Sequence, residues 1–172
     1  MHTPGMRSAL TIAGSDSGGG AGIQADLKTF AAHGVHGLSA IAALTAQHTR
    51  GVTAVHVPPL DFLRAQLAAC FDDFDIGAVK IGMLASAEVI ECVADALTQA
   101  QSLPRPALAP VVVLDPVMVA TSGAKLLADD ALDALRTRLL PLADIVTPNI
   151  PEAELLTGQR IADGDDAHPP TA

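Results

Sequence analysis

The chain has 172 residues, 49% of them hydrophobic but only 2% aromatic, so we expect one domain with an aliphatic core. Its formal net charge of −9 argues against binding nucleic acid or an anionic membrane through bulk charge. The sequence has no unbroken apolar run long enough to span a bilayer and no signal-peptide layout, and its two cysteines lack CxxC spacing, so we expect a cytoplasmic protein with reduced thiols.

The first predicted element is a short buried strand that runs into a glycine-rich turn and then a helix. Residues 9–13 are apolar, and the turn that follows contains Gly14, Gly18, Gly19, Gly20 and Gly22. Beyond the turn, apolar residues recur at helical spacing from Ile23 onward. Glycines without a Cβ allow close approach of a ligand, and the start of a helix presents unpaired N–H groups.

Several interpretations of this glycine loop compete. A flexible strand–helix connection is the simplest one. A P-loop requires Gly-Lys-Ser/Thr at its end, which is missing here. Gly20, Gly22 and Ala25 fit a loose dinucleotide-binding pattern, but residues 40–47 lack the acid that such a site needs. A cradle for a phosphate or another small molecule remains, and without those two features we interpret the loop as one wall of a substrate pocket.

Strand and helix patterns alternate along the rest of the chain. Further strands are predicted at residues 38–44, 52–57 (a strand or hairpin arm), 76–81, 111–114 and 144–146. Further helices are predicted at residues 60–72, 86–99, 129–139 and 151–158. This alternation predicts an α/β fold, a mainly parallel sheet with helices on both faces, in which all strand ends lie along one edge.

Ligands of open α/β sheets bind at the carboxyl ends of the strands, and the residues there suggest a chemistry. Gln47 carries both a donor and an acceptor, which suits a heteroaromatic ring with a ring nitrogen and an amino group. Asp26 could reach over the same site, although a solvated helix acid is an equal alternative. Asp115 and Glu152 are candidates for holding Mg²⁺ beside phosphates. Lys80 and Lys125 are candidate phosphate contacts, with surface lysines as the more ordinary interpretation.

Together these motifs resemble the ribokinase-like vitamin kinases, and specifically the hydroxymethylpyrimidine/phosphomethylpyrimidine kinases of thiamine biosynthesis. The matching stretches are residues 13–26, 44–51, 80–83, 113–118, 122–123 and 147–154. The resemblance implies an ATP- and Mg²⁺-dependent kinase that phosphorylates 4-amino-5-hydroxymethyl-2-methylpyrimidine and then its monophosphate. It implies a pyrimidine pocket lined by Gly14, Ala21, Asp26, Thr45, Gln47, Met83 and Val117. It also implies that Asn149 and Glu152 help to place Mg²⁺ and phosphate.

One departure from the family limits these implications. The family's C-terminal part carries a Gly-Thr-Gly segment that supplies the anion hole and the catalytic base, and nothing after residue 158 resembles it. We therefore expect residues 1–160 to form an incomplete ribokinase-like domain, followed by a disordered tail at 161–172, and we assign no catalytic residue. We expect a truncated chain that is inactive by itself and that could form a homodimer. The alternatives are a pyridoxine/pyridoxal kinase and a non-catalytic pyrimidine-binding module.

Overall fold

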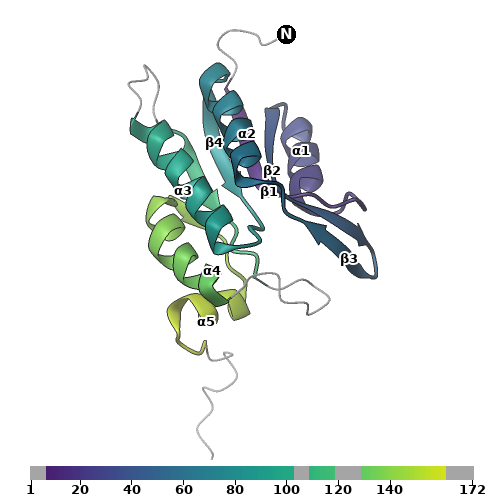
Figure 1. Ribbon diagram of the computed structural model, residues 1–172, viewed down its shortest axis with the longest axis vertical. Coiled ribbons are helices and arrows are strands. Elements are labelled where there is room, and N and C mark those ends of the chain that lie inside the picture. Colours follow the sequence, from purple (N-terminus) through teal and green to yellow (C-terminus); the bar gives the residue numbers. More distant parts are fainter. Residues whose placement is uncertain (1–6, 103–108, 119–128, 162–172) are drawn as a thin grey trace, which may run out of the picture.

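The computed structural model describes residues 7–102, 109–118 and 129–161, and it shows one sheet with helices on both faces (Figure 1). Three features that the sequence singled out lie outside the described residues: Lys125, the motif at 122–123 and the tail from residue 162. Among the helices of the described ranges, none has the length and apolar character needed to cross a bilayer.

The sheet has the strand order β3-β2-β1-β4-β5-β6. Its strands are β1 (Ser8–Gly14), β2 (His36–His48), β3 (Gly51–His56), β4 (Ile76–Ile81), β5 (Val111–Leu114) and β6 (Ile145–Val146). All neighbouring strands pair in parallel except β3, which pairs antiparallel with β2 at the edge of the sheet. The predicted mainly parallel α/β sheet is therefore confirmed, and the carboxyl ends of its parallel strands lie along one edge.

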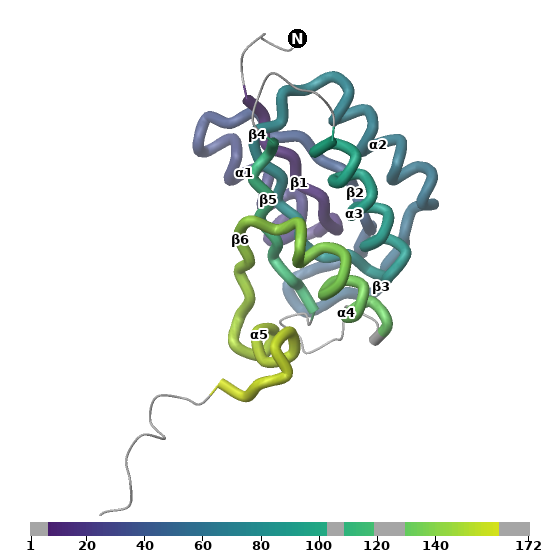
Figure 2. Tube along the Cα trace, turned by 90° about the vertical axis from the view of Figure 1, so that its left-hand side faces the viewer, coloured from purple at the N-terminus to yellow at the C-terminus, as the bar shows by residue number. Residues whose placement is uncertain are grey.

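The helices divide between the two faces of the sheet (Figure 2). They are α1 (Gly22–Ala32), α2 (Leu60–Asp73), α3 (Ala87–Ser102), α4 (Asp129–Ala134) and α5 (Ile150–Thr157). Helix α1 packs on β1 and β2 on one face, which we call the α1 face. Helices α2, α3 and α4 pack on the opposite face, and α5 follows β6 beyond the carboxyl edge.

The hydrophobic core lies between the sheet and the helices of the opposite face. Alternate residues of the parallel strands point into it, including Leu10, Val79 and Val112, which are fully buried. Strand β1 is buried along its whole length because strands flank it on both sides and helices cover both faces. This central position holds the end of β1, and hence the glycine loop, firmly in place.

The largest differences from the predicted elements lie in one strand and one helix. Strand β2 continues to His48 instead of ending at Leu44, because its polar end pairs with β3 in a hairpin. The predicted helix at 129–139 is α-helical only to Ala134 and then forms a π-helical turn, Leu135–Leu139. Leu135 and Leu139 are both buried, so the turn keeps an apolar side facing the core despite the change of helix type.

Candidate functional site

Two glycines of the loop between β1 and α1 lie in close contact with other parts of the chain. Gly22 has φ +56°, and a Cβ there would lie 2.3 Å from the Gly14 carbonyl oxygen. At Gly14, a Cβ would lie 2.6 Å from the Met83 side chain. Glycine at these two positions therefore brings the start of α1 against the end of β1 and lets Met83 pack directly on the backbone.

The N–H groups of this loop are occupied by a carboxylate of the chain itself. Asp16 Oδ1 accepts the Gly18 N–H at 2.8 Å, and its Oδ2 accepts the N–H groups of Gly20 and Ala21, each at 2.9 Å. Burial acts to raise the pKa of Asp16, but the amides of residues 18, 20, 21 and 19 together lower it below its ordinary value of 3.8. The loop is thus a filled anion cradle, which argues against a phosphate site here and agrees with a pocket wall.

A second set of hydrogen bonds joins the loop to the end of β2. The Ser17 hydroxyl bonds both the carbonyl oxygen and the N–H of Gln47, each at 2.7 Å. The Thr45 hydroxyl lies 2.7 Å from the Ser15 carbonyl oxygen and 3.3 Å from Gln47 Oε1. These bonds fix the backbone of Gln47 and restrain its amide, so that its donor and acceptor have a defined direction.

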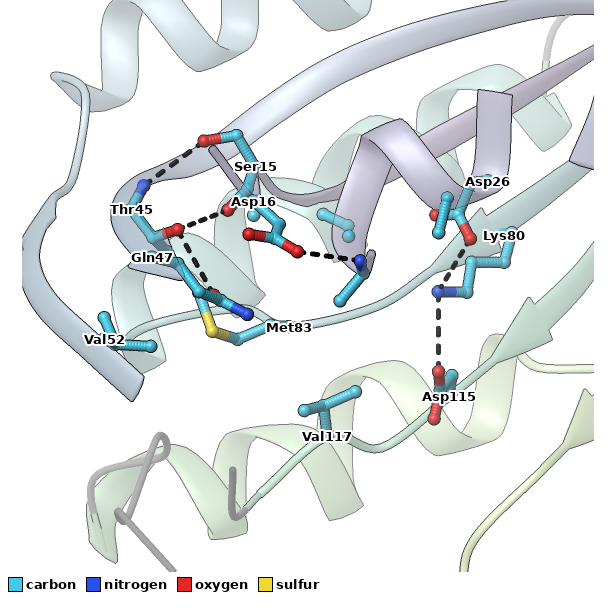
Figure 3. Close-up of a pocket in the computed structure, with 15 residues that line it drawn as sticks. Ser15, Asp16, Asp26, Thr45, Gln47, Val52, Lys80, Met83, Asp115 and Val117 are labelled. Carbon is cyan, nitrogen blue, oxygen red and sulfur yellow. Dashed lines mark hydrogen bonds and ion pairs between the residues drawn. The ribbon is translucent and has the colours of Figure 1, made fainter. Parts of the chain in front are cut away.

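A pocket of about 340 Å³ opens at this edge of the sheet, in the size range of small-molecule sites. All seven residues predicted to line a pyrimidine pocket line it, although they come from separate segments of the chain. Figure 3 shows that the pocket has two ends of different chemistry. Thr45, Gln47 and Val52 form a neutral end, with Met83 beside them, and Asp26, Lys80 and Asp115 form a charged end.

Lys80 connects two carboxylates at the charged end. Its Nζ lies 3.3 Å from Asp26 Oδ1 and 3.4 Å from Asp115 Oδ2, and its side chain is 25% exposed. The Thr11 hydroxyl donates to the other Asp26 oxygen at 2.6 Å. The surface interpretation of Lys80 is therefore wrong, because strand β4 directs this side chain into the site.

The sequence did not indicate several residues that shape the pocket. Asp16 could have been found, because an Asx residue followed by glycines two and four positions later is a typical turn that binds backbone amides. Val52 could not have been found, because it enters the pocket through the antiparallel pairing of β3 with the extended end of β2. The contribution of Thr11 depends on a tertiary contact with α1.

Asn149 and Glu152 form the start of α5. The Asn149 side chain accepts the Glu152 N–H at 2.9 Å, and Glu152 Oε2 accepts the Asn149 N–H at 3.0 Å, which makes a reciprocal capping box. No group of three or more His, Cys, Asp or Glu residues within the described ranges could hold a metal. These two residues therefore do not fit a ready-made Mg²⁺ cage, and their assignment as metal ligands stays a prediction.

Comparison with known proteins places this site in a family. A family model described as phosphomethylpyrimidine kinase matches residues 16–170, nearly the whole chain. The chain belongs to the phosphomethylpyrimidine kinase family. A hydroxymethylpyrimidine/phosphomethylpyrimidine kinase of Haemophilus influenzae is 58% identical over 158 residues, which are 92% of this chain and 56% of that relative. The chain thus spans about half the length of the curated relatives that it matches.

Solved structures agree with this family and with the ribokinase-like fold. A phosphomethylpyrimidine kinase from Clostridium difficile 630 matches with a TM-score of 0.83 and 48% identity, covering 93% of this chain and 66% of that one. A pyridoxal kinase of Bacillus subtilis, solved as an ADP complex, matches with a TM-score of 0.77 and 39% identity, covering 94% and 57%. A phosphomethylpyrimidine kinase and a pyridoxal kinase thus share the fold of the described chain.

Proposed function

We propose that the chain is the pyrimidine-binding portion of a cytoplasmic kinase that phosphorylates 4-amino-5-hydroxymethyl-2-methylpyrimidine and then its monophosphate, with ATP. In the first step the hydroxymethyl oxygen would attack the γ-phosphorus, the bond from that phosphorus to the ADP oxygen would break, and the hydroxyl proton would pass to a general base that is not assigned among the described residues. In the second step an oxygen of the monophosphate would attack in the same way. The reaction is the one that the names of the relatives describe.

One observation carries this proposal: the predicted substrate residues converge on a single pocket with a neutral and a charged end. The Gln47 amide at the neutral end suits the ring nitrogen and amino group of an aminopyrimidine. The hydroxymethyl group would then point toward Asp26, Lys80 and Asp115, where phosphate chemistry needs charged groups.

ATP and Mg²⁺ are part of the proposed reaction. The candidate Mg²⁺ ligands Asp115 and Glu152 differ in how well they suit that role. Mg²⁺ in kinases keeps several waters and binds one or two carboxylates together with the phosphates. Asp115 is a partly exposed carboxylate on the pocket wall and could supply one such ligand. Glu152 would have to give up its bond to the Asn149 N–H, and a Glu152→Gln variant, which can keep that bond, would separate capping from metal binding.

Calorimetric titration of the 172-residue chain with the hydroxymethyl pyrimidine tests the proposal. We expect binding without ATP turnover, because no described residue is assigned as catalytic base. Gln47→Ala should weaken binding by about tenfold or more, because it removes two hydrogen bonds to the ring. Gln99→Ala removes an equal side chain from the exposed face of α3 and should leave binding unchanged.

Two outcomes would contradict the proposal. If the folded chain does not bind the hydroxymethyl pyrimidine, the pocket is not a pyrimidine site. Tighter binding of pyridoxal than of the pyrimidine in the same titration would favour a pyridoxal kinase, the activity named for a structural relative. If the 172-residue chain both binds the pyrimidine and turns over ATP, the alternative of a non-catalytic binding module is excluded.

A further inference from the structure

The charges around the pocket do not match a phosphorylated ligand. Three of its described lining residues are acids, Asp16, Asp26 and Asp115, and Lys80 is the one basic residue among them. The charge of Asp16 is stabilised by hydrogen bonds from the loop amides, whereas the other two carboxylates face Lys80 at the charged end. The first substrate of the proposed reaction is an uncharged alcohol, whereas its monophosphate carries close to two negative charges at neutral pH.

Lys80 retains the capacity to bind a further anion. A lysine ammonium has three N–H donors, so its two ion pairs, with Asp26 and Asp115, leave at least one donor for a ligand. Asp26 is held independently by the Thr11 hydroxyl at 2.6 Å, so it keeps its place if Lys80 turns toward a ligand. Lys80 lies beside the pocket space and is 25% exposed, so an incoming oxygen can reach it.

We propose that Lys80 is the residue that admits the monophosphate into the pocket, by binding its phosphate oxygens, while the unphosphorylated pyrimidine binds largely without it. This inference rests on the proposed function. A phosphate at the charged end would meet the repulsion of Asp26 and Asp115, and within the described lining only Lys80 offsets it. The alcohol has no charge to offset, and its ring is held at the Gln47 end.

The test compares two ligands on variants of the 172-residue chain, by calorimetry in Mg²⁺-free buffer. We expect Lys80→Met to weaken binding of the monophosphate by about tenfold or more, since a hydrogen bond between charged groups is lost. Binding of the free hydroxymethyl pyrimidine should change by no more than about threefold. Lys80→Arg should retain most of the monophosphate binding. Arg64→Met, an equal loss of charge on the exposed face of α2, should alter neither.

Lys80→Met leaves the carboxylates of Asp26 and Asp115 unpaired, which could prevent folding. A double variant avoids this problem. Lys80→Met/Asp26→Asn has the same net charge at this end as the unsubstituted chain, and the amide oxygen introduced at position 26 can still accept from Thr11. Compared with Asp26→Asn alone, it should lose the monophosphate by a larger factor than the free pyrimidine. Monophosphate binding by the double variant at the unsubstituted level, or equal losses of both ligands, would overturn the role of Lys80. Failure of the unsubstituted, folded chain to bind either ligand would overturn the proposed function itself.

Discussion

At the scale of single residues, the site is built from polar side chains that bind the chain's own backbone. Asp16 occupies the loop amides, Ser17 bonds both backbone groups of Gln47, and Thr45 bonds the Ser15 carbonyl. The bonds of Asp16 and Thr45 are partly buried and replace water there, whereas the bonds of Ser17 lie at the surface. The directions of the side chains that face the pocket therefore depend on residues that do not themselves face a ligand.

Asp16 provides a stability prediction with a defined pH dependence. Because its pKa is lowered in the folded state, its stabilisation is complete above the ordinary value of 3.8 and is lost as the pH falls through the lowered value. Asp16→Asn keeps the shape but cannot carry the charge, so we expect it to lower the free energy of unfolding by about 1–3 kcal/mol at neutral pH. Urea denaturation at several pH values measures this difference.

The difference between Asp16→Asn and the unsubstituted chain should shrink as the pH falls from 3.8 through the lowered pKa of Asp16, since protonation removes the charge that only the aspartate carries. A difference that stays constant across this range would show that the charge of Asp16 does not stabilise the loop. Pyrimidine titration of the same variant would then report whether the loop still forms the pocket wall.

At the scale of elements, the junction between β1 and α1 is constrained by a close backbone contact. Gly22 and Gly34 both have positive φ, at +56° and +69°, but they differ in their surroundings. A Cβ at Gly22 meets the Gly14 carbonyl oxygen, whereas a Cβ at Gly34 meets nothing within 4 Å. The pair thus separates the cost of a left-handed backbone from the cost of a steric clash.

We therefore expect Gly34→Ala to lower the free energy of unfolding by about 1 kcal/mol, the cost of placing alanine at positive φ. Gly22→Ala should cost about 3 kcal/mol or more, because the backbone at the start of α1 must also move. Thermal denaturation of the two variants measures both effects. Equal losses would mean that the contact with Gly14 does not limit the position of α1.

The sequence predicted the elements well where hydrophobic spacing alone decides them. Residues 76–81 and 111–114 coincide with β4 and β5, because buried parallel strands are short apolar runs. It failed where a partner decides the structure: residues 45–48 are polar, yet they extend β2 because β3 pairs with them. The π-helical turn after α4 also had no visible signal, because its leucines keep a helix-like apolar spacing.

The candidate site divides in the same way. Convergence of the strand-end residues followed from parallel topology, and all seven proposed substrate residues line the pocket. The pairing of Lys80 with Asp26 and Asp115 could not be read from the sequence, since it joins β4 to α1 and to the end of β5. A lysine in a strand looks the same in sequence whether it points to solvent or into a site.

At the scale of the whole molecule, the α1 face leaves apolar strand residues exposed. By register, Val111 and Ile145 lie on this face, on the side of β1 away from β2, and they are 45% and 50% exposed. Ala78 on β4 pairs with Val111, Val113 on β5 pairs with Ile145, and both are partly buried. A contiguous apolar area beside a two-residue edge strand favours association with a second copy of the chain.

We therefore predict that the chain self-associates as its concentration rises, and that Val111→Lys/Ile145→Lys reduces this association. Sedimentation velocity over a range of concentrations measures it. Val55→Lys is a suitable control, because Val55 is equally exposed, at 50%, but lies on β3 at the other edge of the sheet. The prediction would be contradicted if the chain stays monomeric at every concentration. It would also be contradicted if Val55→Lys reduces association as much as the double variant does.

Because Asp16 occupies the N–H groups of the glycine loop, the loop does not respond to the anions in solution. Asp16 is in effect a tethered ligand, and its effective concentration at the loop amides exceeds what a free anion reaches in solution. Occupancy of the loop is therefore decided when the chain folds, and it does not vary with the supply of phosphate. The loop contributes a constant shape, and under the role proposed above, discrimination between charged and uncharged ligands would depend on Lys80 at the other end of the pocket.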